Sequence, residues 1–491
     1  MAGILPLHFV YAFSKGWHRR EEAALMMMDS PGATRLLEQI LERTVRVGVV
    51  GLGYVGLPLA VELAGAGFRT TGLDVDVGKV EMVNGGSSYV PDVLASDLAR
   101  LRRTGALEAT VDFDVVSELD TISVCVPTPL RKTTTPDLSY VIRVFEQIAK
   151  YLHRGMLIVL ESTVQPGTTK ATVLTMLEAT GLRVGHDFFL AFSPERVNPG
   201  NAFFNTRNIP KVVGGVTRDC SRLTSALYGT AIESIVSVSS PYVAEVVKQL
   251  EDEFRAVNIG LVNELALRCQ RMGVDVWEVI HAAMTKPFGF MPFYPGPGLG
   301  CRGTSTETLY RTQSADERPF QPRFIELAAH VNAAMPLHIV ELIADALNSG
   351  AKALRGAYVL IAGLAYKQNV DDIRESPALE VMSLLVAKGA KVAYSDPYVP
   401  LLSGSAWGGG FDLASIALTP AMIREADCVA ILTDHSLFDT DEIVAHANVV
   451  VDARNATGGC APRVFRLGAP RPLAPAPPAV QGPDVTARSI H

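Results

Sequence analysis

A glycine-rich motif and an acidic residue after it are spaced as the binding of a dinucleotide requires. The motif GLGYVG follows an apolar run and opens a helix-like pattern. In such a turn the first glycine permits the bend, the second admits a pyrophosphate to the backbone, and the third allows close helix–strand packing. Asp74 can accept hydrogen bonds from a ribose hydroxyl and would repel a 2′-phosphate, so the sequence favours NAD over NADP. The candidate cofactor residues here are Gly51, Leu52, Gly53, Tyr54, Val55, Gly56 and Asp74. Lys79 is open to two interpretations, a cofactor ligand or a solvated surface lysine.

Two further polar turns follow strand-like runs. CVPTP occupies 125–129 and ESTVQPG occupies 161–167. Carboxyl ends of parallel strands meet at one edge of a sheet, where open α/β sheets bind ligands. We therefore expect Pro127, Thr128 and Thr163 beside a nicotinamide, although a proline-rich turn without a ligand would read the same way.

The run TKPFGFMPFYPGPGLG at 285–300 combines glycines and prolines with aromatic residues directly after a helical stretch. Such a composition predicts a stiff, close-fitting loop. Glycines let backbone amides approach a ligand without side-chain obstruction. The loop is thus a candidate substrate-binding segment.

These motifs need a scaffold of alternating strands and helices, and the sequence predicts one. Strand patterns occupy 45–50, 70–75, 121–126, 156–160 and 211–214, with a helix at 57–66. Helical spacing then covers 241–284 and 324–348, before a second series of strands at 358–362, 391–395, 428–432 and 449–452. The expected fold class is α/β, with two Rossmann-like domains of parallel sheets joined by a long central helical connector.

Composition narrows the class of protein. The 491 residues are 48% hydrophobic and 19% charged, with a net charge of −7. That balance gives no electrostatic reason to expect nucleic-acid binding. Six scattered cysteines without a CxxC pair are typical of a reduced, cytoplasmic protein, and no apolar run reaches the roughly 18 residues that span a bilayer. The scattered histidines form no metal-ligand pattern, so no metal is expected.

Eight motifs in order identify the chain as similar to the UDP-glucose/GDP-mannose dehydrogenase family, over about Val45 to Asn455. They are GLGYVGLPLA, VPTP, ESTVQPGTT, FSPERVNPGN, FRAVNIGLVNELA, TKPFGFMPFYPGPGLG, LAYKQNVDDIRESPA and SDPYVP. Within the family the chain most resembles the branch that oxidises UDP-N-acetylhexosamines, UDP-N-acetylglucosamine or UDP-N-acetylmannosamine. The resemblance implies that a UDP-sugar's primary alcohol is oxidised to a uronate in two NAD-dependent steps. LAYKQNVDDIRESPA argues against another two-domain dehydrogenase, one that acts on hydroxy acids.

The resemblance also implies residue roles. Thr163 and Glu195 would position water and proton transfers, and Lys248 would stabilise developing oxyanion charge. A cysteine thiolate would capture the aldehyde, and its oxidised thioester would be hydrolysed. Arg374 would reach the cofactor, from its own subunit or across a dimer interface, unless it only joins a surface ion-pair network. The implied substrate residues are Glu195, Arg196, Val197, Asn198, Lys248, Tyr294, Gly296, Gly298, Gly300 and Lys367.

Two departures from the family pattern bear on catalysis. Asp252 stands where the family has an asparagine, four residues after Lys248, so either its pKa is raised or this part of the site is weakened. After Gly300 the family continues with a catalytic cysteine and an aspartate, but here Gly303 and Glu307 occupy those positions. Cys301 lies two residues too early, roughly 7 Å along an extended chain. Compensating frameshifts over codons 301–319 would explain the intact length and lost identity. The candidate catalytic residues are Thr163, Glu195, Lys248, Asp252, Cys301 and Glu307.

The expected domains follow from these patterns. They are an N-terminal extension, partly disordered or mis-started before Met26–Met28, at 1–44; an NAD-binding domain at 45–240; a helical dimerisation domain with the substrate loop at 241–348; a UDP-sugar-binding α/β domain at 349–460; and a disordered tail at 461–491. We expect a cytoplasmic homodimer, or a higher homo-oligomer, that supplies polysaccharide biosynthesis and binds no nucleic acid or membrane. The alternative function is an impaired homologue that binds NAD and UDP-sugar without completing the reaction.

Overall fold

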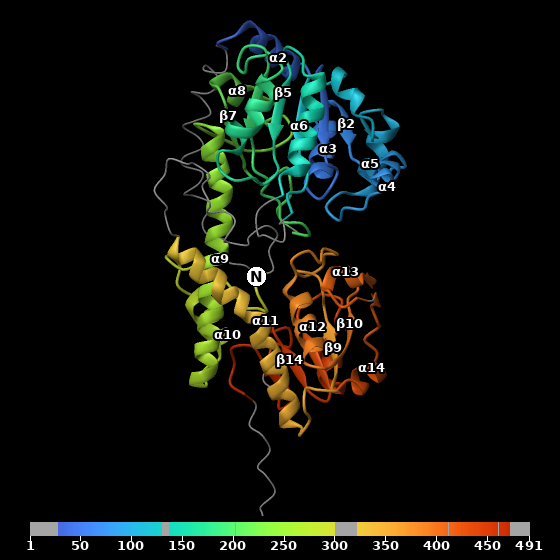
Figure 1. The fold of residues 1–491 in the computed structure, drawn as a ribbon, viewed down its shortest axis with the longest axis vertical. Helices are drawn as coiled ribbons and strands as arrows, with labels where there is room; N and C mark the ends of the chain where they lie inside the picture. The colour runs from blue at the N-terminus through green and yellow to red at the C-terminus, as the bar shows by residue number, and fades with distance from the viewer. Residues whose placement is uncertain are drawn as a thin grey trace, which may run out of the picture. The chain divides into compact units, whose positions relative to one another are not determined.

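The structure is a computed structural model that describes residues 28–129, 137–201, 203–299, 322–410, 412–459 and 461–471. These residues form two compact units, one ending at Arg255 and the other beginning at Ala256. Each unit contains its own α/β sheet (Figure 1). The predicted fold class is confirmed.

The sheet of the first unit has the order β3-β2-β1-β4-β5-β6-β7-β8. Its strands are β1 (Arg46–Val50), β2 (Arg69–Leu73), β3 (Leu107–Thr110), β4 (Thr121–Val124), β5 (Leu157–Leu160), β6 (Phe189–Phe192), β7 (Lys211–Gly215) and β8 (Ile235–Val238). The strand order reverses between β1 and β4, which is where doubly wound sheets bind ligands. The sheet departs from the predicted parallel arrangement at one place, because β6 and β7 pair antiparallel.

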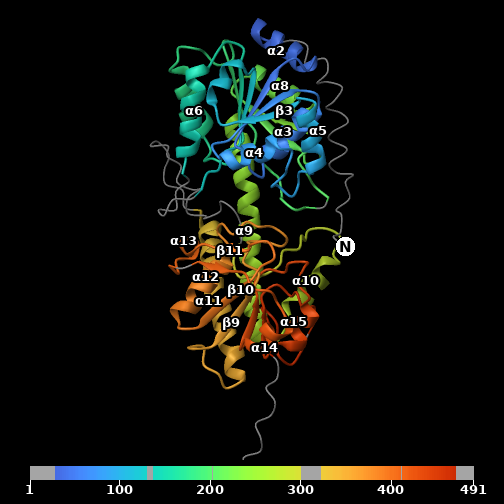
Figure 2. The ribbon, with the colours of Figure 1, turned by 90° about the vertical axis from the view of Figure 1, so that its right-hand side faces the viewer.

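Helices cover both faces of this sheet (Figure 2). One face packs against α2 (Pro31–Leu41), α3 (Gly56–Gly65), α4 (Val77–Asn84), α5 (Ala95–Arg103) and α8 (Arg218–Tyr228). The other packs against a 3₁₀ helix (Phe113–Glu118), α6 (Ser139–Tyr151), a π-helical turn (Thr169–Leu174) and α7 (Thr175–Glu178). Side chains that alternate along each strand supply the two cores, so these strands read as continuous apolar runs.

Part of the expected N-terminal extension is a helix packed on the core. The Ser30 hydroxyl accepts a hydrogen bond from the Ala33 amide and caps α2, whose first residue is Pro31. Leu36 and Ile40 are buried. Serine at the N-cap and proline at the first helical position are the expected start signals. Residues 1–27, with the predicted alternative start at Met26 and Met27, lie outside the described residues.

The predicted helical stretch 241–284 is two helices rather than one. α9 spans Pro241–Met272, and α10 spans Val276–Met284. Gly273, with φ of 69°, ends α9 because only glycine adopts that conformation readily. Asp275 then caps α10 by accepting a hydrogen bond from the Trp277 amide. α11 (Arg323–Ser349) matches the second predicted helix closely.

The sheet of the second unit is parallel, with the order β10-β9-β13-β14-β15. Its strands are β9 (Tyr358–Ala362), β10 (Lys391–Ser395), β13 (Cys428–Ile431), β14 (Val450–Asp452) and β15 (Val464–Arg466), with a separate pair β11 (Leu401–Leu402) and β12 (Leu413–Ala414). α11, α12 (Pro377–Ala387) and α13 (Gly404–Trp407) cover one face, and α14 (Pro420–Glu425) and α15 (Thr440–His446) cover the other (Figure 2).

The predicted start of the disordered tail at 461 is wrong. Val464–Arg466 pairs with β14, and Leu467 is buried. Three residues in a proline- and arginine-rich segment show no periodicity, and only pairing with a strand distant in the sequence makes them a strand. Residues 472–491 lie outside the described part of the chain.

Within the described residues, α11 is the one helix long and apolar enough to cross a membrane, judged by length and composition alone. Many of its apolar residues, Met335, Ile339 and Ile343 among them, are buried in the core of the second unit. α11 is therefore placed as a core helix of this unit.

Candidate active site

The glycine turn between β1 and α3 has the geometry that the sequence predicts. A side chain at Gly51, where φ is 91°, would come within 2.7 Å of the Cys125 carbonyl oxygen. A Cβ at Gly56 would lie 1.8 Å from the carbonyl oxygen of Gly51, so the third glycine is required for packing. No atom lies within 4 Å of the Cβ position at Gly53, which leaves room above the start of α3 for a pyrophosphate. The turn fits the cofactor.

Asp74 lies at the end of β2 and contacts this turn. Its Oδ2 accepts a hydrogen bond of 2.8 Å from the Leu52 amide and lies 3.8 Å from Lys79 Nζ. The Tyr89 hydroxyl donates to the Leu52 carbonyl at 2.6 Å, and burial together with Asp74 raises the pKa of Tyr89. Asp74 thus orders the glycine turn and lies within ion-pair distance of Lys79, whose contact with the cofactor stays a prediction. Tyr54 and Val55 follow in the same turn and are partly exposed.

The two polar turns after β4 and β5 are joined directly. The Thr128 hydroxyl donates to the Thr163 carbonyl at 2.8 Å, and the Ser162 hydroxyl donates to the Val126 carbonyl at 2.7 Å. Pro127 lies between the two bonded residues of the first turn. The structure therefore brings together Pro127, Thr128 and Thr163, as the sequence predicts.

Glu245, which the sequence analysis did not select, ties α9 to the turn after β5. Its carboxylate accepts hydrogen bonds from the Gly167 amide at 2.5 Å, the Thr169 amide at 2.9 Å and the Thr169 hydroxyl at 2.6 Å. Burial raises the pKa of Glu245, and these three hydrogen bonds oppose that rise. Its position one helical turn before Lys248 was the available signal, since residues three apart share a face.

Lys248 lies between two carboxylates, with 14% of its side chain exposed. Its Nζ lies 3.1 Å from Glu195 Oε1 and 3.4 Å from Asp252 Oδ1, and Arg255 approaches the same Asp252 oxygen at 2.5 Å. Burial disfavours the ammonium, but Glu195 and Asp252 raise the pKa of Lys248 above its usual value. The lysine is therefore a fixed positive charge at neutral pH, placed to stabilise an oxyanion.

For Asp252 the sequence left two alternatives, a raised pKa or a weakened site. Asp252 is 3% exposed, and burial raises its pKa, while Lys248 and Arg255 reduce that rise. The raised pKa is the first of the two predicted alternatives. Its two cationic neighbours offset the repulsion that this carboxyl would exert on a developing oxyanion.

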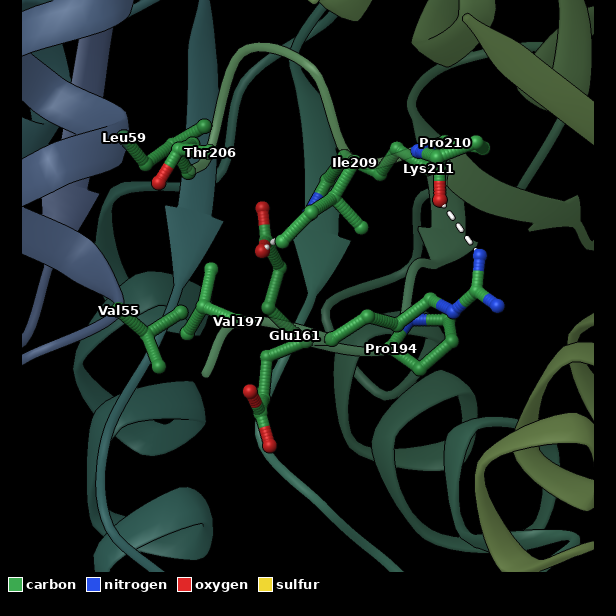
Figure 3. A pocket seen from close by; sticks show the side chains of 11 residues that line it. Val55, Leu59, Glu161, Pro194, Val197, Thr206, Ile209, Pro210 and Lys211 are labelled. Atoms are coloured by element: carbon green, nitrogen blue, oxygen red, sulfur yellow. Dashed lines mark hydrogen bonds and ion pairs between the residues drawn. The ribbon is translucent and has the colours of Figure 1, made fainter. Parts of the chain in front are cut away.

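Residues after β6 line a small, open pocket in the first unit (Figure 3). Its walls comprise Val55, Leu59, Glu161, Pro194, Glu195, Arg196, Val197, Thr206, Ile209, Pro210 and Lys211. Arg196 is held by Glu251 at 2.6 Å and by the Pro210 carbonyl at 2.6 Å. The carbonyl of Asn198 accepts from the Asn201 amide at 3.1 Å. The predicted group Glu195, Arg196 and Val197 thus shares one pocket with Val55 of the glycine turn.

A polar chain that begins at Glu161 and Lys211 in the wall of this pocket was not predicted. Glu161 pairs with Lys211 Nζ at 2.6 Å and accepts from the Tyr228 hydroxyl at 2.5 Å, and that hydroxyl lies 2.9 Å from Ser123 Oγ. Burial and Glu161 raise the pKa of Tyr228. The sequence predicted Lys211 as the first residue of a strand. No pattern near it in the sequence indicated that it would pair with Glu161, the first residue of the ESTVQPG motif.

In the second unit the end of the predicted substrate loop, residues 295–298, is packed against protein, whereas Phe288, Met291 and Tyr294 are exposed. Tyr294 stacks on Trp277 with ring centroids 6.0 Å apart, and a Cβ at Gly298 would lie 2.9 Å from Pro377. The Gly296 amide donates to Asn263 Oδ1 at 3.0 Å, and a Cβ at Gly296 would meet the guanidinium of Arg454 at 2.6 Å. Gly298 is therefore needed for packing of the loop against Pro377, whereas the close atoms at Gly296 belong to the end of the Arg454 side chain.

Asn263 and Arg454 are residues that sequence reasoning missed at this loop. Asn263 is fully buried and donates to Asn332 Oδ1 at 2.9 Å, and Arg454 donates to the Leu432 carbonyl at 2.9 Å. Burial lowers the pKa of Arg454, although Asp434 and Asp452 oppose that shift. An asparagine on the apolar face of a helix was the one available signal.

Lys367 and Arg374 both lie in the loop between β9 and α12. Lys367 Nζ lies 5.9 Å from the centre of the Tyr366 ring. Arg374 forms a two-pronged pair with Asp372, at 2.8 Å and 2.6 Å, and is half-exposed. Its contacts in this structure are thus those of the ion-pair alternative, and its contact with the cofactor stays a prediction.

Three predicted site residues, Gly300, Cys301 and Glu307, lie outside the described residues, as does the 301–319 segment. Among the residues described, no group of three or more histidine, cysteine, aspartate or glutamate side chains could hold a metal ion.

Comparison with known proteins adds to this geometry. Three domain models of one family match the chain: its NAD-binding domain at residues 45–232, its central domain at 242–334 and its UDP-binding domain at 360–459. UDP-N-acetyl-D-glucosamine 6-dehydrogenase of Pseudomonas aeruginosa is 35% identical over 360 residues, covering 73% of this chain and 84% of that protein. UDP-N-acetyl-D-mannosamine dehydrogenase of Pyrococcus horikoshii is 32% identical over 419 residues, covering 84% and 96%.

Solved structures agree with the sequence relatives. The UDP-D-ManNAc dehydrogenase structure from Pyrococcus horikoshii matches with a TM-score of 0.75 at 31% identity, covering 86% of this chain and 99% of that one. The glycine turn with Asp74 and the first domain model together identify NAD as the cofactor. The chain belongs to the UDP-glucose/GDP-mannose dehydrogenase family of NAD-dependent enzymes.

Proposed function

We propose that this enzyme oxidises the C6 primary alcohol of a UDP-N-acetylhexosamine to the uronate in two NAD-dependent steps. The observation that carries the proposal is the largely enclosed Lys248, held between Glu195 and Asp252 in the same unit as the glycine turn. The relatives named for UDP-N-acetyl-D-glucosamine and UDP-N-acetyl-D-mannosamine support this class of sugar. The UDP-binding domain match at 360–459 supports a UDP-linked substrate.

The residues divide the chemistry between them. Bound NAD supplies the acceptor for a hydride in each oxidation. Lys248 stabilises negative charge that develops on the C6 oxygen, and Glu195, with Thr163, positions the proton acceptor and the hydrolytic water. Glu245 holds the turn that carries Thr163. Arg196 and Val197, which line the pocket beside Glu195, would contact the sugar together with Asn198.

The second oxidation needs a thiol. A thiolate adds to the C6 aldehyde to form a thiohemiacetal, loss of hydride gives a thioester, and water releases the carboxylate and the thiolate. Cys301 is the candidate thiol and Glu307 the candidate acid that follows it. Gly303 stands at the position where the family has its cysteine, and this favours a second candidate function, a protein that binds NAD and UDP-sugar without completing the reaction.

One measurement separates the two functions. Purified protein is incubated with NAD and either UDP-N-acetylglucosamine or UDP-N-acetylmannosamine, and NADH formed per sugar consumed is measured. Two equivalents establish the complete oxidation and exclude the binding-only function. Saturable binding of the UDP-sugar with no NADH overturns the proposed activity, and one equivalent with trapped aldehyde locates the failure at the thiol step.

A Cys301→Ser variant then identifies the thiol. If Cys301 is the nucleophile, this variant stops after one equivalent of NADH. Cys125, which lies beside the glycine turn, provides the control, because burial and Glu161 raise the pKa of its thiol and make it a poor nucleophile.

We further propose that the enzyme acts as a cytoplasmic homodimer, or a higher homo-oligomer, and that its uronate product enters polysaccharide biosynthesis. Lys367 would contact the diphosphate, Tyr294 with the backbone at Gly296 and Gly298 would enclose the nucleotide sugar, and Arg374 would serve the cofactor. The proposed domain division is the predicted one, with residues 461–471 added to the UDP-sugar-binding domain.

A further inference from the structure

Asp396, at the carboxyl end of β10, is a buried carboxylate that the proposed chemistry does not use. It is 1% exposed. Five donors surround it: the amides of Leu364 at 2.7 Å, Ala365 at 3.0 Å, Tyr398 at 2.8 Å and Val399 at 3.1 Å, and His435 Nε2 at 3.0 Å. Burial opposes its charge, but the bonds from His435 and from Ala365 lower its pKa below the usual value. Asp396 is therefore an anion that organises the backbone around it.

His435, which follows β13, completes this arrangement. Its side chain is fully buried and packs beside Tyr398 and Phe438, with ring centroids 5.0 Å and 5.3 Å away. Its Nδ1 lies 2.9 Å from the amide nitrogen of Asn369. A backbone amide can only donate, so Nδ1 accepts and the proton of the neutral ring is on Nε2, facing Asp396.

Asn369 is the point at which this chain of bonds reaches the loop between β9 and α12. Its φ of 60° places it in the left-handed region, where asparagine is among the tolerated residues. Its side-chain oxygen accepts from the Ser436 amide and hydroxyl, each at 3.0 Å, and from the Tyr398 hydroxyl at 3.3 Å. The three groups Asp396, His435 and Asn369 thus join the loops that follow β9, β10 and β13.

This junction lies at a particular place in the sheet. β9 pairs with β10 on one side and with β13 on the other, so the strand order reverses there. The carboxyl edge at such a reversal is the ligand-binding position of open α/β sheets. Lys367, proposed for the diphosphate, lies two residues before Asn369 in the joined loop.

We propose that His435 and Asp396 are positioning residues for nucleotide binding: through Asn369 they hold the 363–376 loop in the conformation that presents Lys367 to a UDP diphosphate. The inference rests on the proposed function, because it takes a UDP-linked ligand as given. The imidazole acts through its two directed hydrogen bonds, an acceptor toward Asn369 and a donor toward Asp396. A residue that only filled the core would not need a neutral imidazole with its proton on Nε2 and its acceptor at Nδ1.

The test compares three variants of the full chain by calorimetric titration with UDP alone. His435→Phe keeps an aromatic ring but neither bond, and UDP binding should weaken about tenfold or more, as expected for loss of buried hydrogen bonds. His435→Gln retains one acceptor and one donor and should restore affinity to within about threefold of the native protein. His446→Phe, at a histidine that contacts Arg424 on the surface, is the control and should leave UDP affinity unchanged.

A second variant, Asn369→Gly, keeps the inference testable if His435→Phe fails to fold. Glycine accepts the positive φ, so the backbone remains and only the side-chain bonds are lost. We expect weaker UDP binding, native-like thermal unfolding and unchanged NAD affinity. Native UDP affinity in both His435→Phe and Asn369→Gly overturns the inference, as does failure of His435→Gln to restore binding to a folded protein. If the native protein binds NAD but not UDP, the proposed function itself fails, and that result is separate from any variant.

Discussion

At the residue scale, the environment of Lys248 decides what the candidate site can do. A lysine on a helix of mixed polarity is ordinarily solvated, whereas this one contacts two carboxylates and is 14% exposed in its side chain. Its neighbours keep its pKa above the usual value, so its stabilising charge persists from acidic pH until the pH rises through that raised pKa. Glu195 and Asp252 depend on it, because each is itself partly or fully buried.

The variant Lys248→Met tests this dependence. It leaves two carboxylates near each other without their shared cation, so we expect the free energy of unfolding to fall by about 3 kcal/mol. The rate of NADH formation should fall by about 10² to 10³, because a donor to the developing oxyanion is lost. Denaturant unfolding and initial rates measure the two effects.

The control for that experiment is Lys150→Met. Lys150 is exposed on α6, where it contacts Gln147, and its loss should change neither quantity. Native stability in Lys248→Met would contradict the buried ion cluster, and a native rate would contradict the catalytic role.

At the element scale, the glycines of the turn between β1 and α3 meet two different requirements, packing of the fold and binding of a ligand. Gly51 and Gly56 are required because protein atoms crowd the places where their side chains would go. Gly53 faces open space, so its lack of a side chain serves a ligand rather than the fold. The GxGxxG pattern alone could not separate these two demands.

This difference predicts opposite outcomes for two alanine variants. Gly53→Ala should fold with native stability but bind NAD about tenfold or more weakly, because its Cβ occupies the space for the pyrophosphate. Gly56→Ala should lower the free energy of unfolding by about 2 kcal/mol or more, since its Cβ would overlap the Gly51 carbonyl. Thermal unfolding and NAD titration distinguish them, and equal effects of both variants on stability would refute the assignment.

The packing of α9 on α11 makes the free energy of unfolding depend on pH. His338 of α11 bonds to Gln270 of α9 at 3.2 Å. Burial lowers the pKa of His338 below its usual 6.5, and Glu341 only partly opposes this. The unfolded chain therefore binds more protons near that pH, so stability is present above pH 6.5 and is lost as the pH falls through it.

His338→Gln should flatten this dependence. We expect the native protein to lose stability between about pH 7.5 and about pH 5.5, and the variant to lose up to about 1 kcal/mol less. His330→Gln, at an exposed position of the same helix, should keep the native slope. Urea unfolding followed by tryptophan fluorescence at each pH measures the free energy of unfolding. Equal slopes of this free energy against pH in His338→Gln and the native protein would contradict the role of His338.

At the scale of the whole molecule, α9 carries apolar side chains that the single chain leaves exposed. Val246, Leu250, Phe254 and Leu261 are all at least 39% exposed, and Leu250 and Leu261 exceed 60%. Their spacing of four, four and seven residues places them near one face of the helix. An apolar stripe of this kind is typical of a subunit interface, and it supports the proposed homodimer.

Leu261→Glu tests the proposed dimer. A charge within an apolar interface should convert the protein to monomer, or raise the dimer dissociation constant at least about 100-fold, as measured by sedimentation equilibrium. Leu437→Glu, at an equally exposed leucine of the second unit, should leave the assembly unchanged. Dimers that persist in Leu261→Glu at the native dissociation constant would show that this face is not the interface.

Much of the fold follows from local patterns. Buried strands such as β1 and β9 are largely apolar or β-branched runs, and α3 and α11 have helical spacing, so these elements were predicted nearly to the residue. The short strands β3, β6 and β8 were not, because four apolar or mixed residues carry no distinguishable period. β15 was taken for part of a disordered tail, since a strand of three residues exists only through its pairing with β14.

The candidate site divides in the same way. The sequence by itself determined the glycine turn, Asp74 and the two polar turns, because each depends on residue type and on spacing within one segment. Lys248 was indicated by the resemblance of its motif to the family. Only the tertiary structure decided that Lys248 is largely enclosed between Glu195 and Asp252, that Glu245 holds the Thr163 turn, and that Asp396 meets His435. Most of these contacts join residues from different segments. The burial that raises the pKa of Asp252, and the hydrogen bonds that lower the pKa of Asp396 against its own burial, arise only when those segments pack together.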